Sequence, residues 1–192
     1  MILGDIPAIE TARLSLRSMG TQLLAALAAG RVDAAQALVD YEIPVDFSLL
    51  RKAAMITHRL ALIEADPSQH PWMYRAIVSK RDGRLVGHIS FHHKAPDPDV
   101  RAYVQNGAEL GYGIEAAYRR RGFAKESAIA MMTWAADRFD VRSFVLSISP
   151  RNVPSLKLAE SMGFEAIAEH RDPVDGPELV MRVDIDRVVR PP

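Results

Sequence analysis

The feature that most constrains the fold is a glycine-rich strand that runs through a basic turn directly into a helix. The strand "AELGYGI" occupies residues 108–114, and the turn "YRRRGFAKES" follows at residues 118–127. Small and apolar residues then recur at helical spacing from about Gly122 to Phe139, which predicts a helix whose core face carries Ala124, Ala128, Met132, Ala135 and Phe139. The first backbone N–H groups of such a helix have no partner within it, and the positive end of the helix dipole favours an anion. Because Gly122 has no Cβ, a ligand can approach closely, so the turn is predicted to hold a phosphate. The alternative is a solvated basic helix start.

The net charge of the chain and the residue spacing in the turn argue against several classes of phosphate-binding protein. Lys plus Arg and Asp plus Glu each number 24, so the net charge is zero and the four cations between Arg119 and Lys125 are a local feature. A general nucleic-acid binder would need many phosphate contacts and is disfavoured. The turn also lacks the G-x-x-x-x-G-K-[ST] spacing of a P-loop, and no G-x-G-x-x-G opens a helix.

Composition predicts an ordinary globular chain. Its 192 residues contain 48% hydrophobic and 25% charged residues and show no linker, so we expect a single domain over residues 1–192. There is no cysteine, which excludes disulfides, thiolate metal sites and a cysteine nucleophile. The start "MILGDIPAIE" is unlike a signal peptide, and no apolar run could span a bilayer. We therefore expect a cytoplasmic protein that does not associate with membranes.

The order of elements predicts a mixed sheet with helices packed on it. One strand at residues 12–18 precedes two helical regions, at 21–30 and 46–65. The first is expected to have Thr21 as its cap and Gly30 as its stop, and the second to end at Asp66-Pro67. A hairpin then turns at Asp82-Gly83, before the glycine-rich strand and its helix. The remaining elements are a strand at 143–149, a helix at 153–163 and two closing strands at 164–171 and 178–184. This β-α-α-β-β-β-α-β-α-β-β order belongs to the α/β (α+β) class.

Three segments together carry a resemblance to a known family. "RRRGFA", Arg119–Ala124, is similar to the [QR]-x-x-G-x-[GA] motif of the GNAT superfamily, the acyl-CoA-dependent N-acetyltransferases. "NVPSLKLAESMGF", Asn152–Phe164, resembles a segment of the RimJ/RimL-like branch, and "ETARLSLRSM" resembles its opening strand. The resemblance covers about residues 9–185. It implies the GNAT fold: a mostly antiparallel central sheet of about seven strands, a splay between strands four and five, and helices on both faces.

The resemblance also implies where acetyl-CoA, the acyl donor, would bind. Gly113 and Ile114 at the end of strand four would pair with the pantetheine amides. The pyrophosphate would lie on the backbone of Arg119, Arg120, Arg121, Gly122, Phe123 and Ala124. Lys125 or Arg120 would reach the 3′-phosphate, and the choice between them is open. Asn152 would hold the pantetheine or orient Ser155.

The chemistry of the transfer calls for a base. An alkyl amine has a pKa near ~10, and attack on a thioester needs the neutral form. Glu109 is the candidate, because strand alternation puts it on one face with Gly111 and Gly113. The alternative is a carboxylate that pairs with an arginine.

The thiolate that leaves during the transfer needs a proton donor or a hydrogen-bond donor. Many GNAT enzymes carry a tyrosine acid where this chain has Ala159, so the resemblance gives Ser155 the role of a hydrogen-bond donor to the thiolate. The alternative is that Ser155 only caps its helix.

Histidines and aromatic residues on the hairpin complete the candidates. His88 and His92 share a strand face, but no third ligand stands at a metal-binding spacing, so we expect no metal and interpret them as substrate-side or surface residues. Trp72 and Tyr74 belong to the core, a dimer surface or an acceptor pocket.

Three functions remain in play. The preferred one is an N-acetyltransferase that moves acetyl from acetyl-CoA directly to a primary amine, on a small molecule or a protein N-terminus, in a ternary complex. The others are a non-catalytic acyl-CoA sensor on the same fold, and a phosphate- or nucleic-acid-binding module that uses the arginines alone. A homodimer is common for the branch.

Overall fold

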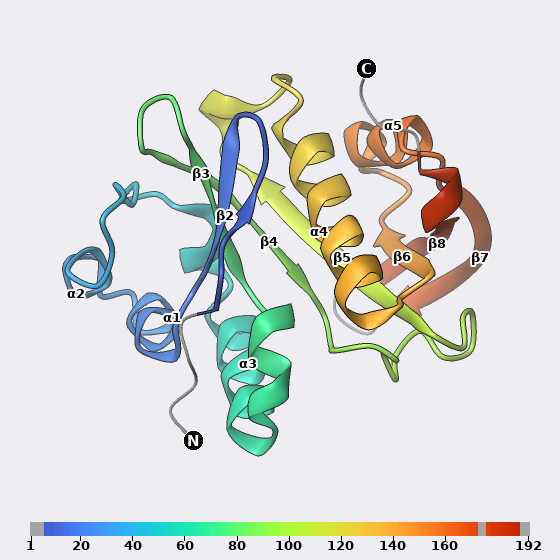
Figure 1. Ribbon diagram of the computed structural model, residues 1–192, viewed down its shortest axis with the longest axis horizontal. Coiled ribbons are helices and arrows are strands. Elements are labelled where there is room, and N and C mark those ends of the chain that lie inside the picture. Colours follow the sequence, from blue (N-terminus) through green and yellow to red (C-terminus); the bar gives the residue numbers. More distant parts are fainter. Residues whose placement is uncertain (1–5, 173–175, 189–192) are drawn as a thin grey trace. The chain divides into compact units, whose positions relative to one another are not determined.

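The computed structural model describes residues 6–172 and 176–188, which contain eight strands hydrogen-bonded in the order β1-β2-β3-β4-β5-β6-β8-β7 (Figure 1). The strands are β1 (Ile9–Glu10), β2 (Leu14–Ser18), β3 (Arg75–Ser79), β4 (Leu85–Phe91), β5 (Gly107–Ile114), β6 (Ser143–Ile148), β7 (Glu165–Asp172) and β8 (Gly176–Asp184). The α-helices are α1 (Thr21–Ala28), α2 (Val32–Gln36), α3 (Ala53–Ala65), α4 (Phe123–Phe139) and α5 (Val153–Ser161). Short 3₁₀ helices cover Ser48–Arg51, Pro67–Trp72, Ala116–Tyr118 and Ile185–Arg187.

The mixed, mostly antiparallel sheet agrees with the sequence prediction. The pairs β1–β2, β2–β3, β3–β4, β6–β8 and β7–β8 are antiparallel, whereas β5 and β6 are parallel. The β5–β6 register joins Gly107–Glu109 to Ser143–Val145, although β5 itself continues to Ile114. The expected count of about seven strands becomes eight, because the two-residue strand β1 is too short for an alternating pattern to reveal it.

The chain divides into two compact units. The first comprises Met1–Ser90 and Tyr112–Ser127, and the second comprises Phe91–Gly111 and Ala128–Pro192. The single domain expected over residues 1–192 stays a prediction. Within the described residues, no helix combines the length and the apolar composition needed to cross a membrane.

The core of the first unit lies between its helices and strands β3 and β4. Apolar residues of α1 and α3 pack with Ala76, Val78 and Leu85, and each fully buried leucine contributes on the order of 1.5–3 kcal/mol. Gly30, with a φ of +67°, follows the end of α1 as expected. The expected cap Thr21 is instead the first helical residue, and Gly20 is the N-cap without a side-chain bond.

A buried cation ties strand β3 to its surroundings in this unit. The Arg75 guanidinium donates to the carbonyl oxygens of Pro7, Leu16 and Pro71 over 3.0–3.2 Å. Burial lowers the pKa of Arg75 to about 10. Hydrogen bonds to carbonyls offset part of the cost of burying this charge, so Arg75 has a structural role.

The core of the second unit forms on both faces of β6. Phe91 stacks on Trp134 of α4 and on Phe144 of β6, with ring centroids 6.4 and 6.0 Å apart. On the opposite face, Val145 packs with valines of the segment between β4 and β5 and with Val180 of β8. The expectation that Phe139 also belongs to the core is wrong, since it is 46% exposed at the end of α4.

Two further helix boundaries agree with sequence signals. α5 has proline in its first turn and is followed by Gly163 with a φ of +94°. α3 ends before Asp66-Pro67, as expected, although the helical region starting at Asp46 is interrupted by a 3₁₀ turn. Residues 173–175, at the turn between the closing strands, lie outside the described residues.

Candidate active site

The end of β5 places two predicted donor-binding residues in the first unit. A Cβ on Gly113 would lie 2.6 Å from Cε1 of His88 on β4, so only glycine fits beside this imidazole. The neighbouring carbonyl of Ile114 accepts a hydrogen bond from Nε of Arg119 at 2.9 Å. The glycine at 113 is therefore explained by the close approach of the His88 ring.

The basic turn after β5 contains two left-handed residues directly before α4. Arg120 and Gly122 both have left-handed backbones, with φ of 59° and 79°. The hydrogen bond from Glu126 N to Gly122 O, 3.0 Å long, is an early turn of α4, so the N–H groups just before Glu126 have no partner within the helix. The turn therefore brings Arg119, Arg120, Arg121, Gly122, Phe123 and Ala124 together around a helix N-terminus, as predicted.

The side chains of this turn differ in what they contact. Nε of Arg119 donates a hydrogen bond to the carbonyl oxygen of Ile114 at the end of β5. The Arg121 guanidinium lies 5.3 Å from the ring centroid of Tyr118. Arg120 is exposed and Lys125 is half-buried in the first turn of α4. Two of the four cations are thus turned toward their own segment.

Arg13, on the loop before β2, contacts this helix start through its guanidinium. This role of Arg13 was not predicted from the sequence. Its Nη1 donates to Arg121 O at 2.9 Å, its Nη2 lies 2.6 Å from Glu126 Oε2, and its guanidinium lies 4.9 Å from the Phe123 ring centroid. Burial alone would raise the pKa of Glu126, but hydrogen bonds from Thr11 and Arg13 outweigh it and lower that pKa. The contacts join residues more than a hundred positions apart, so no local pattern could reveal them.

His88 is buried, contrary to the expectation of a substrate-side or surface residue. Its ring lies edge-on to Phe47 and Tyr74, with centroids 5.8 and 5.9 Å away. Burial, and secondarily the charge of Lys52, lowers the pKa of His88 to about 3, so the imidazole is neutral at physiological pH. Tyr74 and Trp72 are buried too, which supports the core interpretation of both.

Glu109 lies in the second unit, where its carboxylate contacts a histidine. Its Oε2 is 3.1 Å from Nδ1 of His92, just beyond the end of β4. The structure thus gives this carboxylate an imidazole partner. Asp97 is nearby and buried, and its Oδ2 accepts a hydrogen bond from Glu109 N at 3.3 Å. Burial raises the pKa of Asp97.

One group of side chains in the described part of the chain has a spacing compatible with a cation. Potential ligand atoms of His93, Asp97 and Asp99 lie within 4.8 Å of one another. Oxygens of this group already accept hydrogen bonds from Asp99 N and Glu109 N, and His93 lies 3.3 Å from Asp99. The group is thus explained by its internal contacts, and we assign no metal to it.

The start of α5 shows that Ser155 is not the residue that caps this helix. Asn152 is the N-cap, and its side chain accepts a hydrogen bond from Ser155 N at 3.4 Å, so the cap is the asparagine. Ser155 is half-buried, and its hydroxyl makes no hydrogen bond within the residues the structure describes. Ala159 on the next turn is fully buried, so a tyrosine placed there would overpack the core.

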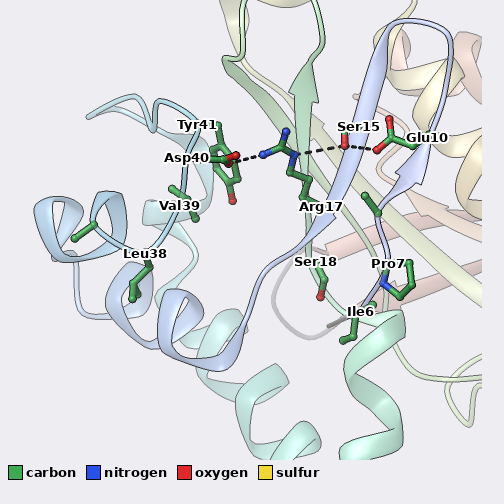
Figure 2. Close-up of a pocket in the computed structure, with 12 residues that line it drawn as sticks. Ile6, Pro7, Glu10, Ser15, Arg17, Ser18, Leu38, Val39, Asp40 and Tyr41 are labelled. Atoms are coloured by element: carbon green, nitrogen blue, oxygen red, sulfur yellow. Dashed lines mark hydrogen bonds and ion pairs between the residues drawn. The ribbon is translucent and has the colours of Figure 1, made fainter. Parts of the chain in front are cut away.

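A separate hollow opens in the first unit, away from every predicted site residue. It measures about 760 Å³ and lies among β1, β2 and residues 37–41. Figure 2 shows Arg17 reaching between Asp40 and Ser15, and Ser15 in turn donating to Glu10. None of the residues assigned to acetyl-CoA lines this hollow. Its polar side chains already pair with one another, so it gives no indication of a ligand.

The sequence of the chain matches a known domain family and a bacterial relative. Residues 13–165 match the model of the acetyltransferase (GNAT) domain. The uncharacterized N-acetyltransferase YjdG of Bacillus subtilis is 30% identical over 88 residues, which is 46% of this chain and 48% of YjdG. The match thus spans about half the length of this relative.

Two solved structures share the fold over nearly their whole length. The ribosomal-protein-S5-alanine acetyltransferase of Vibrio fischeri has a TM-score of 0.62 and 15% identity, and the alignment covers 95% of this chain and 99% of that one. RimL, a ribosomal L7/L12 α-N-protein acetyltransferase in complex with coenzyme A, has a TM-score of 0.61 and 18% identity, with coverages of 94% and 99%. At these identities the likeness establishes the fold alone.

Proposed function

The chain belongs to the GNAT acetyltransferase family, and on that premise we propose that it transfers acetyl from acetyl-CoA directly to a primary amine. The observation that carries the proposal is the turn of Arg119–Ala124, whose two left-handed residues open α4 in the family's phosphate-binding motif. In this proposal both substrates are bound together, because the cysteine-free chain offers no thiol to carry the acetyl group.

The donor is assigned to the residues that the motif predicts. Gly113 and Ile114 pair with the pantetheine amides, and the backbone of Arg119–Ala124 holds the pyrophosphate. Lys125 or Arg120 is assigned to the 3′-phosphate, because both belong to the same basic turn. Arg13 stabilises the turn from behind, through Arg121 O and Glu126.

The reaction needs a proton to leave the amine before the amine attacks. An alkylammonium with a pKa near ~10 is mostly protonated at neutral pH. Glu109 draws this proton away, directly or through His92. The neutral nitrogen then attacks the thioester carbonyl carbon, the C–N bond forms and the C–S bond breaks. The second amine proton goes to the departing sulfur, so the products are the amide and CoA thiol.

Ser155 is assigned to the sulfur side of this reaction. A serine hydroxyl is a poor acid, so its contribution is a hydrogen bond to the developing thiolate. Asn152 holds Ser155 in place through the cap that it forms on α5. The capping role of Asn152 and the unused Ser155 hydroxyl support this division of roles.

The acceptor and the partners are proposed only as classes. The family resemblance and the ribosomal-protein acetyltransferases among the structural relatives favour a protein N-terminus or a small primary amine. Nucleic acid and membranes are not expected as partners, given the zero net charge. The cytoplasmic location and a homodimer stay predictions.

Calorimetric titration tests the donor assignment. We expect acetyl-CoA and free CoA to bind with similar affinity, since the pyrophosphate and pantetheine contacts are common to both. Dephospho-CoA, which lacks the 3′-phosphate, should bind more weakly. Absence of heat with all three ligands, from a protein that melts cooperatively, would overturn the proposal.

A further inference from the structure

We propose that the group which contacts the amine and takes its proton is the imidazole of His92, and that Glu109 is its positioning residue. This inference rests on the proposed function and identifies the base of the same reaction. Three observations in the second unit carry it: the contact between Glu109 Oε2 and His92 Nδ1, the unequal exposure of the two side chains and the glycine next to the ring.

The contact with Glu109 sets the orientation of the imidazole. Glu109 Oε2 lies 3.1 Å from Nδ1 of His92. An ionised carboxylate only accepts hydrogen bonds, so Nδ1 carries a proton and donates it to Glu109. In the neutral ring, Nε2 then holds the lone pair, which is the form a general base needs.

Exposure decides which member of the pair can meet a substrate. The His92 side chain is 32% exposed, whereas that of Glu109 is 9% exposed. The Glu109 backbone is held as well, because its N–H donates to the buried carboxyl of Asp97 and its carbonyl accepts from His92 N at 2.9 Å. An amine therefore reaches the imidazole more readily than the carboxylate behind it.

The glycine at position 111 provides space for this ring. A Cβ there would lie 2.9 Å from Nε2 of His92, closer than real Cβ contacts are found. Gly111 is two residues from Glu109 on β5, so both lie on the same strand face. The space beside Gly111 is occupied by the imidazole of His92.

The proton balance of the step is complete. Nε2 of neutral His92 takes one proton from the ammonium, which leaves a neutral amine and an imidazolium. The nearby Glu109 carboxylate stabilises that imidazolium. After the C–N bond has formed and the C–S bond has broken, the second amine proton goes to the sulfur. The imidazolium then releases its proton to solvent, which restores the neutral ring.

His92→Ala is the primary variant, with His93→Gln as its matched control. His93 follows directly in the chain but pairs with Asp99 and lies outside the proposed machinery. We expect His92→Ala to lower the amine-dependent rate by about 10²-fold, with acetyl-CoA affinity and melting temperature little changed. Added imidazole should restore part of the lost rate, and His93→Gln should retain the full rate.

Glu109→Gln separates the positioning role from direct base catalysis. We expect a loss of similar size that added imidazole does not restore, because His92 still fills the site. ¹⁵N NMR of the histidine rings should show His92 protonated on Nδ1 in the parent protein, with a smaller share of this tautomer in Glu109→Gln. This readout is independent of turnover and would not respond to a merely structural carboxylate.

These experiments distinguish failure of the proposed function from failure of the His92 assignment. If the parent protein acetylates no amine, the proposed function is overturned, and this inference falls with it. If the parent protein is active and His92→Ala is equally fast, or if His92 is protonated on Nε2 alone, only the assignment of His92 is overturned.

Discussion

Gly122 combines a left-handed backbone with a place in the turn that is proposed to hold the pyrophosphate. Its φ is 79°, and a Cβ would also lie 3.2 Å from Nη2 of Arg13. A branched residue would therefore strain the backbone, press on the Arg13 guanidinium and block the approach of a phosphate.

Comparison of Gly122→Val with Gly83→Val tests the role of this glycine. Gly83 has a similar φ of +68° in the hairpin turn, with open space around its Cβ position. Both variants should lose stability, by roughly 1–2 kcal/mol for a left-handed L-residue. Only Gly122→Val should weaken acetyl-CoA binding, by at least about tenfold in calorimetry. Equal affinities in the two variants would contradict the pyrophosphate assignment.

Ser155 offers a hydroxyl whose role can be separated from stability. Since Asn152 forms the cap, Ser155→Ala should leave the melting temperature and CoA affinity nearly unchanged. Turnover at saturating acetyl-CoA should fall by about tenfold, because the lost bond acts on the transition state. An unchanged rate constant would leave Ser155 without a catalytic role.

The cap of α5 gives the complementary test. Asn152→Ala removes the acceptor for Ser155 N, and loss of an N-cap costs about 1 kcal/mol. At 3.4 Å this bond is long, so we expect a value in the lower half of the usual range. Urea denaturation should show a lower midpoint with an unchanged m-value. If Ser155→Ala were the more destabilising variant, the division of roles between the two residues would be wrong.

Elements with regular patterns were predictable from the sequence. Alternation located β2 and the hairpin, and Gly30 and Gly163 marked helix ends, because these signals are local. The two-residue strand β1 and the 3₁₀ turn after Phe47 are too short for a period to develop. The turn of Arg119–Ala124 was found because its motif is contiguous.

Contacts between distant segments were not predictable. The sequence favours Glu109 as the base and places His92 on a strand face, but the contact between them depends on how two strands align, which neither segment encodes. The contact of Arg13 with α4 has the same non-local origin. The polarity of His88 predicts a substrate-side or surface position. The residue is buried instead, because Gly113 leaves room for its ring in the interior.

Burial of His88 makes the stability of the protein depend on pH. The folded state disfavours the imidazolium, because burial lowers the pKa of His88 from its ordinary value of 6.5 to about 3. The unfolded chain therefore binds more protons in this interval, so the free energy of unfolding falls as pH decreases from about 6.5 toward about 3. The contribution of one such group approaches about 1.4 kcal/mol per pH unit.

His88→Leu should remove that contribution. We expect the variant's free energy of unfolding to depend less steeply on pH across the interval from 6.5 to about 3, because no imidazole must lose its proton on folding. Urea melts at several pH values would measure the difference between parent and variant, which cancels the other titrating groups. Parallel curves would show that His88 is accessible to protons in the folded state.

Transfer of acetyl to an amine is the activity that the whole molecule is proposed to perform. The most direct measurement is CoA release from acetyl-CoA, with a panel of small amines and N-terminal peptides, and with product mass recorded in each reaction. The proposal predicts that at least one amine accelerates release, with one acetylated amine formed for each CoA. If acetyl-CoA binds but no amine raises release above hydrolysis in buffer, the protein is a sensor on this fold and the proposal of catalysis is wrong.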